Sequence, residues 1–164
     1  MGAGLDLIVV HGISLPPGRF GGPWIDRLFC NGSLPPEVDP FFATLQGLKV
    51  STHVLIDRHG VPTQYVPFAR RAWHAGKSSY RGRSACNDFS VGIELEGTDD
   101  LPYETAQYGV LAALVLALRR TYPSLRAAEI VGHSDVSPGR KTDPGAAFDW
   151  PRLRGLLTAV RGAT

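Results

Sequence analysis

The chain is organised around one stretch near its C-terminal end, EIVGHSDVSPGRKTDPG at residues 129–145. Its first three residues are typical of a short strand. The two Pro-Gly pairs that follow predict a loop leaving the end of that strand. The loop carries His133, Lys141 and Asp143. An imidazole and a carboxylate in such a loop are candidate metal ligands or acid–base groups, although a plain polar surface loop is the alternative interpretation.

The composition predicts one globular domain over residues 1–164, because the chain is 43% hydrophobic and 20% charged. A net charge of +2 without a basic run argues against nucleic acid as a partner. The N-terminus lacks an export signal and no apolar stretch approaches ~20 residues, so we expect a cytoplasmic protein without a membrane segment. Cys30 and Cys86 form no recognisable framework, and we expect reduced thiols.

Hydrophobic patterning predicts strands at residues 7–10, 49–57, 63–67, 89–96 and 129–131. The first is continuously apolar, as in a buried central strand, and it ends at His11. The second and third flank a tight turn and predict an antiparallel hairpin. In the fourth, apolar side chains alternate with four polar or small residues, Ser90, Gly92, Glu94 and Glu96.

Helices are expected at residues 23–29, 102–120 and 149–160, with one or two helical turns at 41–45. Asp149 is a plausible N-terminal cap of the last helix. Together the elements predict an α/β domain with a central mixed β-sheet flanked by helices.

Two histidines follow predicted strands, His11 and His133, and together with Asp143 they would form a three-ligand site. Three ligands and an open fourth position are typical of catalytic zinc. Hydrolysis also needs a base, and Glu94 and Glu96 share the polar face of one strand, so the pattern does not separate them. Lys141 would lie near such a metal and could stabilise an oxyanion. We expect His59 to be exposed in a turn, and His53 to be structural or to support a residue of the site.

Four segments carry a resemblance to a known family: VVHGISLPPG at 9–18, RAWHAG at 71–76, NDFSVGIELEG at 87–97, and residues 132–145. They resemble the AmpD family, cytoplasmic 1,6-anhydro-N-acetylmuramyl-L-alanine amidases of cell-wall recycling. That family belongs to the zinc amidases that include T7-type lysozymes and peptidoglycan-recognition proteins. The resemblance covers nearly the whole chain and implies the same fold.

The resemblance also implies roles for individual residues. One zinc ion per chain would be bound by His11, His133 and Asp143, with Glu94 as the base and Lys141 stabilising the tetrahedral intermediate. It implies that the muropeptide groove is lined by Trp73, His74, Asn87 and Lys49. Lys49 stands where relatives tend to carry arginine, so the charge is kept but the forked geometry is lost.

The leading hypothesis is hydrolysis of the amide bond between the lactyl group of anhydromuramic acid and L-alanine, by a monomer acting on anhydro-muropeptides. One alternative is a phage-type or autolytic amidase that acts on polymeric peptidoglycan, although the lack of an export signal argues against an autolysin. Another is a non-catalytic peptidoglycan-binding module. Loss of a ligand would mark such a module, and here all three ligands, the base and the lysine are present.

Overall fold

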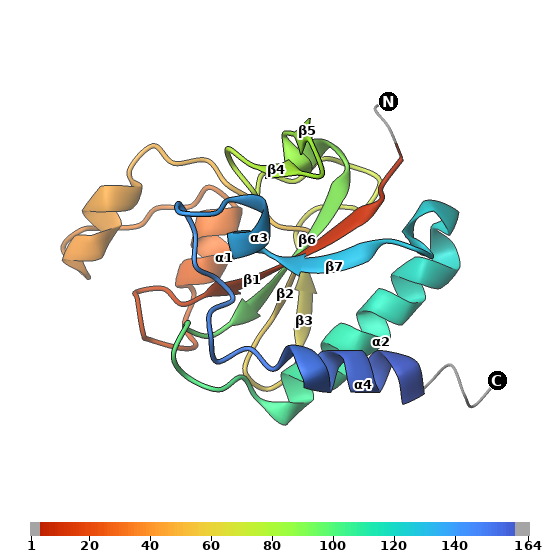
Figure 1. Ribbon diagram of the computed structural model, residues 1–164. Helices are drawn as coiled ribbons and strands as arrows, with labels where there is room; N and C mark the ends of the chain where they lie inside the picture. Colours follow the sequence, from red (N-terminus) through yellow and green to blue (C-terminus); the bar gives the residue numbers. More distant parts are fainter. Residues whose placement is uncertain (1–3, 160–164) are drawn as a thin grey trace.

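The computed structural model of the protein describes residues 4–159. Its centre is a five-stranded sheet with the order β3-β2-β6-β1-β7 (Figure 1). These strands are β1 (Leu7–Ile13), β2 (Val54–Ile56), β3 (Pro62–Gln64), β6 (Ser90–Glu96) and β7 (Glu129–Gly132). The pairs β2·β6, β6·β1 and β1·β7 are parallel, whereas β3 is antiparallel to β2. The predicted α/β fold with a central mixed sheet is confirmed.

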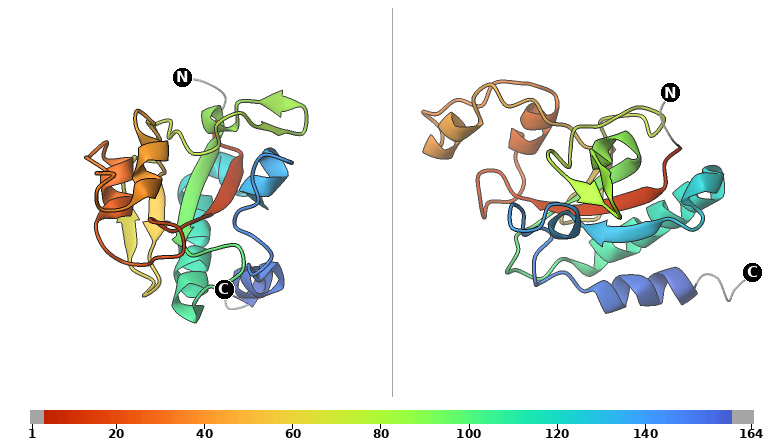
Figure 2. Two further views of the ribbon diagram at one scale, coloured as in Figure 1. Left: turned by 90° about the vertical axis from the view of Figure 1, so that its left-hand side faces the viewer. Right: turned by 45° about the horizontal axis from the view of Figure 1, so that its top comes forward.

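Helices cover both faces of this sheet. The long helices α2 (Thr105–Thr121) and α4 (Trp150–Ala159) lie along one face (Figures 1 and 2). On the other side, α1 (Trp24–Phe29) and the 3-10 helix η1 (Pro40–Leu45) form a cluster with Leu55 of β2. Shorter elements are β4 (Ser79–Tyr80), β5 (Arg83–Ser84), η2 (Cys86–Asp88), η3 (Pro123–Leu125) and α3 (His133–Val136). Within residues 4–159, no helix has the length and apolarity needed to span a membrane.

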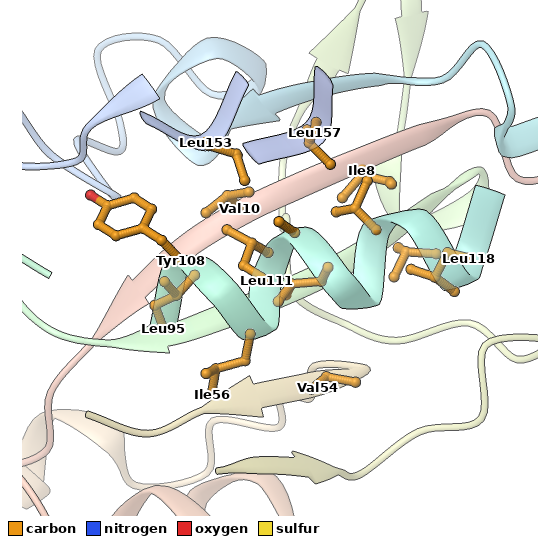
Figure 3. Packing of buried hydrophobic residues seen from close by; sticks show 14 of the residues in the cluster. Ile8, Val10, Val54, Ile56, Leu95, Tyr108, Leu111, Leu118, Leu153 and Leu157 are labelled. Atoms are coloured by element: carbon orange, nitrogen blue, oxygen red, sulfur yellow. The ribbon is translucent and has the colours of Figure 1, made fainter. Parts of the chain in front are cut away.

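The main core lies between the sheet and the two long helices, and Figure 3 shows its packing. Alternate residues of β1 and β6 point into it, including Ile8, Val10 and Leu95. They meet fully buried side chains such as Leu111 of α2 and Leu153 of α4. Phe89 precedes β6 and packs in another cluster, but the alternation predicted for residues 89–96 is confirmed within the strand itself. Its consequence is that the intervening residues of both strands face away from the main core.

The structure departs from the sequence-based prediction in the hairpin, whose strands β2 and β3 are shorter than residues 49–57 and 63–67. The main chain before β2 bonds to a different segment instead. The amide N–H of Ser51 donates to the Trp73 carbonyl at 3.1 Å, and the Trp73 N–H donates to the Ser51 hydroxyl at 3.0 Å. This pairing brings the segment after residue 70 beside the sheet.

The first of the two long helices begins later than predicted, whereas the second begins after Asp149 as predicted. The helix expected at 102–120 begins at Thr105, because Glu104 and Gln107 form a capping box there. Asp149 caps the last helix as expected, since its carboxylate accepts the Arg152 N–H at 2.9 Å. The predicted end of that helix at residue 160 lies outside the described residues. The β4–β5 hairpin falls in a segment for which the sequence predicted neither strand nor helix.

We expect Leu111→Ala to lower the free energy of unfolding by about 2–5 kcal/mol, because it leaves a cavity where α2 packs on the sheet. Urea denaturation followed by circular dichroism measures the change. Leu101→Ala is the matched control, because Leu101 is 48% exposed, and it should change stability by less than about 0.5 kcal/mol. Equal losses in the two variants would contradict this account of the core.

Candidate active site

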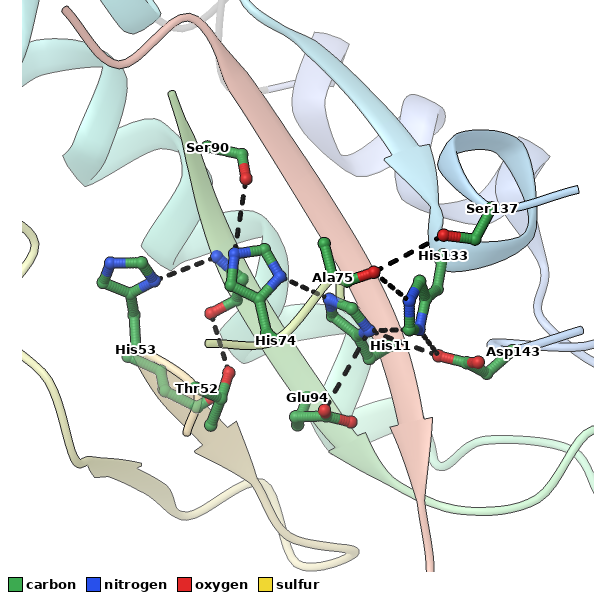
Figure 4. Close-up of polar contacts among 12 residues, drawn as sticks. His11, Thr52, His53, His74, Ala75, Ser90, Glu94, His133, Ser137 and Asp143 are labelled. Carbon is green, nitrogen blue, oxygen red and sulfur yellow. Dashed lines mark hydrogen bonds and ion pairs between the residues drawn. The ribbon is translucent and has the colours of Figure 1, made fainter. Parts of the chain in front are cut away.

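Four functional side chains meet beside β1 (Figure 4). His11 of β1 is the register partner of Glu94 of β6, so both side chains leave the same face of the sheet. His133 begins α3 directly after β7, and Asp143 comes from the loop that follows α3. The parallel strands β1 and β7 thus bring together two histidines that are 122 residues apart.

Three ligand atoms form a nearly regular triangle. The Nδ1 atoms of His11 and His133 are 3.0 Å apart. Asp143 Oδ2 is 3.2 Å from the first of these atoms and 3.0 Å from the second. A tetrahedral zinc ion with bonds of about 2.0–2.2 Å has ligand atoms about 3.3–3.5 Å apart. These residues can therefore hold a metal ion after only a small adjustment.

The outer nitrogens of both imidazoles have partners. His133 Nε2 lies 3.2 Å from the carbonyl oxygen of Ala75, which can only accept a hydrogen bond. The proton of neutral His133 is therefore on Nε2, and the Nδ1 lone pair points at the centre of the triangle. His11 Nε2 lies 2.9 Å from His74 Nδ1. Ligand histidines in metal sites usually donate their second N–H in this way.

The pKa shifts of His11 and Asp143 also favour the protonation states that bind a metal ion. Burial lowers the pKa of His11 to about 4, with repulsion from His133 acting in the same direction and the Asp143 hydrogen bond opposing it. Burial alone would raise the pKa of Asp143, but its bonds and attraction to His11 and His133 outweigh that and lower it. Deprotonated ligands are the form that binds metal ions.

The two glutamates of β6 have different surroundings. Glu96 accepts from the N–H of Gly21 at 2.5 Å and from the N–H of Arg58 at 3.3 Å, so both carboxylate oxygens are bonded to main chain. Glu94 has its Oε1 4.0 Å from His11 Nδ1, while its buried Oε2 has no hydrogen-bond partner. Burial raises the pKa of Glu94 well above its ordinary value, Asp143 adds to this, and Lys141 opposes it. Glu94 therefore combines an unpartnered carboxylate oxygen with a raised affinity for protons.

The loop that carries Asp143 is held at two carbonyls. The N–H of Ser134 donates to the Asp143 carbonyl at 3.0 Å, and the hydroxyl of Tyr103 donates to the Pro144 carbonyl at 2.9 Å. A Cβ atom on Gly12 would overlap the Tyr103 hydroxyl. Sequence reasoning missed Tyr103, and no motif or spacing in the chain could have indicated it.

A hollow of about 230 Å³ opens beside the cluster. Glu94, His133, Lys141 and Asp143 line one part of it. The rest is mainly apolar, and its lining includes Ile13, Leu15, Leu28, Phe29, Phe41, Leu45, Leu48 and Val50. A larger hollow of about 790 Å³ contains Glu96 but none of the three metal-ligand candidates. The smaller hollow is therefore the one that adjoins the candidate metal site.

The four residues predicted to bind substrate differ in their exposure and in whether they line this hollow. Trp73 is 57% exposed and lines the hollow, with the Arg71 guanidinium 3.7 Å from its ring centre. Lys49 lines an adjoining hollow together with Trp73. His74 lines the site's hollow but bonds to His11. Asn87 is buried outside the lining, and its Oδ1 accepts the N–H groups of His74 at 3.1 Å and Ala75 at 2.8 Å.

The other histidines lie where the sequence predicted. His59 is exposed in its turn. His53 is buried, its Nδ1 accepting the N–H of Gly92 at 3.0 Å and its Nε2 donating to the Arg70 carbonyl at 2.9 Å. It is structural, and its bond to Gly92 fixes the strand next to His74. Cys30 and Cys86 are both free thiols.

Comparison with known proteins agrees with this geometry. The sequence profile of the N-acetylmuramoyl-L-alanine amidases matches residues 3–146. The chain belongs to this amidase family. It is 60% identical over 152 residues to the Escherichia coli K12 protein 1,6-anhydro-N-acetylmuramyl-L-alanine amidase AmpD, a match that covers 93% of this chain and 82% of that one. The Haemophilus influenzae AmpD is 50% identical over 148 residues, covering 90% of this chain and 80% of that one.

Solved structures give the same result. A crystal structure of a selenomethionine derivative of AmpD superposes with a TM-score of 0.90 at 56% identity, covering 94% of this chain and 86% of that one. The Escherichia coli amidase AmiD, solved with anhydro-N-acetylmuramic acid-L-Ala-D-gamma-Glu-L-Lys, superposes with a TM-score of 0.65 at 28% identity and covers 93% of this chain and 57% of that one. The predicted family resemblance is therefore confirmed, and the chain is a hydrolytic amidase.

Proposed function

We propose that this amidase cleaves the bond between the lactyl group of 1,6-anhydro-N-acetylmuramic acid and L-alanine, as a zinc enzyme of cell-wall recycling. The observation that carries the proposal is the triangle of His11, His133 and Asp143 beside the unpartnered oxygen of Glu94. The AmpD relatives, which bear the name of this activity, support the choice of the anhydro substrate.

The donor set favours zinc. Two imidazole nitrogens and one carboxylate oxygen leave a fourth position open, which is the arrangement of catalytic zinc sites. When bound, zinc would polarise the scissile carbonyl and acidify a water molecule. The family to which the chain belongs is generally zinc-dependent. We therefore assign one zinc ion per chain to these ligands.

The residues around the metal supply the remaining steps. Glu94 takes a proton from the attacking water and passes it to the leaving nitrogen of L-alanine, for which its raised pKa suits it. The Lys141 ammonium, on the wall of the same hollow, stabilises the oxygen that becomes negatively charged. Glu96 has no such role, because its oxygens are already bonded to main chain.

The substrate would extend from the metal along the apolar part of the hollow. We assign Trp73 to contact with the muropeptide, because its indole is exposed at the hollow's edge. Lys49, in the adjoining hollow, is placed to meet a carboxylate of the peptide. We further propose that residues 1–164 act as one domain, as a monomer in the cytoplasm, where soluble anhydro-muropeptides are the substrate.

Soluble anhydro-muropeptide and intact sacculi, assayed side by side with zinc present, test the substrate. We expect release of the peptide from the soluble substrate and little from sacculi, because the AmpD relatives are named for their action on the anhydro form. Liquid chromatography with mass spectrometry measures both products. Preferential cleavage of sacculi would favour the phage-type or autolytic alternative, and binding without cleavage would favour a non-catalytic module.

We expect His11→Ala and His133→Ala each to remove both zinc and activity, because either change leaves only two of the three ligands. Elemental analysis after dialysis measures the metal. His59→Ala is the matched control, since this histidine is exposed and does not line the hollow beside the ligands, and it should keep one zinc ion. Full zinc content in either ligand variant would rule out this ligand set.

We expect Glu94→Gln to lower kcat by about 10²–10⁴-fold while zinc is retained, because the amide cannot accept the proton of water. Glu96→Gln is the matched control from the same face of the same strand, and it should cost far less activity. Steady-state kinetics and zinc analysis of both variants provide the test. The reverse order of effects would assign the base to Glu96.

We expect Lys141→Ala to lower kcat by about 10²–10³-fold, with zinc kept and KM within a few-fold, because the ammonium acts mainly in the transition state. Lys141→Arg should rescue poorly, since a planar fork does not replace a point charge. Lys77→Ala, at another exposed lysine, serves as the control. A large rise in KM with kcat intact would make Lys141 a ground-state contact instead.

A further inference from the structure

Two consecutive residues hold the outer nitrogens of both ligand histidines. The side chain of His74 meets His11 Nε2 at 2.9 Å, and the carbonyl of Ala75 meets His133 Nε2 at 3.2 Å. The main chain of these two residues is in turn held by Asn87, whose Oδ1 accepts both of their N–H groups. One short segment therefore orients both rings from behind.

The hydrogen bonds behind His11 have a definite direction. A histidine that binds a metal through the Nδ1 lone pair carries its proton on Nε2, so His11 donates to His74 Nδ1. The proton of neutral His74 is then on Nε2, which faces the Ser90 hydroxyl at 3.3 Å. Ser90 donates to the Cys86 carbonyl at 2.6 Å. Since a carbonyl can only accept, the series of bonds has one consistent direction, from the metal ligand to the main chain.

The position of the His74 ring is fixed by its packing as well as by its bonds. A Cβ atom on Gly92 would overlap three atoms of the ring, so the ring lies directly against the main chain of β6. Gly92 itself is fixed on both sides, since its N–H donates to His53 Nδ1 and its carbonyl accepts the Thr52 hydroxyl at 3.0 Å. The ring therefore has little freedom to turn away from His11.

We propose that His74, with Ser90 behind it, is a positioning residue for His11: it fixes the tautomer and ring orientation of this ligand and so sets the affinity of the site for its metal ion. The inference rests on the proposed ligand set. It changes the role of His74 from a substrate contact to a support for a ligand, and it predicts that metal affinity responds to His74 more than KM does. Partners of this kind are worth about 10–100-fold in metal affinity.

The test measures zinc affinity by competition with a chromogenic chelator in four variants of the full chain. His74→Leu removes the acceptor at similar bulk and should weaken zinc binding about 10–100-fold. His74→Asn places an amide oxygen near the Nδ1 position and should restore most of the affinity. Ser90→Ala should weaken binding less than His74→Leu does. His59→Leu, in an exposed turn, should leave it unchanged.

Two further measurements separate positioning from a general structural effect. The visible spectrum of the cobalt-substituted protein reports the ligand field, and it should change in His74→Leu and return toward the original in His74→Asn. KM for anhydro-muropeptide at saturating zinc should stay within a few-fold in both variants. If His74→Leu does not fold, Ser90→Ala and His74→Asn carry the same comparison.

Three results would overturn the inference. One is zinc affinity and a cobalt spectrum in His74→Leu that match those of the unsubstituted protein. Another is a loss in His74→Asn as large as in His74→Leu, and the third is a rise in KM with zinc affinity unchanged. Failure of the proposed ligand set would be recognised separately, because His11→Ala or His133→Ala would then keep full zinc content.

Discussion

Because β1 and β6 run parallel and in register, His11 and Glu94 must leave the sheet on the same face and side by side. The other face of these strands is committed to the core against α2 and α4. A slip of one residue in this pairing would turn the ligand or the base into the hydrophobic core. The chemistry of the site therefore depends on the same alternation that packs the domain, and the core holds the register that the site requires.

Two carboxylates on one strand show how surroundings decide chemistry. Glu94 and Glu96 are both buried, both face away from the main core and lie two residues apart. Main-chain N–H groups bind the oxygens of Glu96 and so join two loops to β6. Glu94 has an unpartnered oxygen beside a metal-binding triangle. Leaving that buried oxygen without a hydrogen-bond partner costs free energy, unless a bound molecule supplies the partner.

Much of the fold and part of the candidate site could be predicted from local sequence. Periodicity indicated the sheet, the long helix and the face that carries Glu94. The positions of His11 and His133 after predicted strands indicated the site, although β1 continues past His11 to Ile13. The alternation of the strand could not separate Glu94 from Glu96. The two differ in that only Glu96 accepts hydrogen bonds from the N–H groups of Gly21 and Arg58, which are distant in sequence. The pairing of Ser51 with Trp73 was missed for the same reason.

The groups that bond to the outer nitrogens of His11 and His133 could be predicted only in part. Ser90 shares the polar face of β6 with Glu94, so the alternation of that strand could have drawn attention to it. The carbonyl of Ala75 could not be found, because a main-chain oxygen has no signature in the sequence. Asn87 resembled a groove residue, yet its amide oxygen is bonded to the main chain of the segment that holds both histidines.

Tyr103 links the residues that adjoin two of the ligands. Its hydroxyl fills the volume beside Gly12, which follows the ligand His11, and bonds to the carbonyl of Pro144, which follows the ligand Asp143. A larger side chain at position 12, acquired to gain a contact in the cleft, would displace this phenol and release the loop of the third ligand. Position 12 and the loop that carries Asp143 are thus coupled through one phenol, so a larger side chain at the first must leave room for the contact that holds the second.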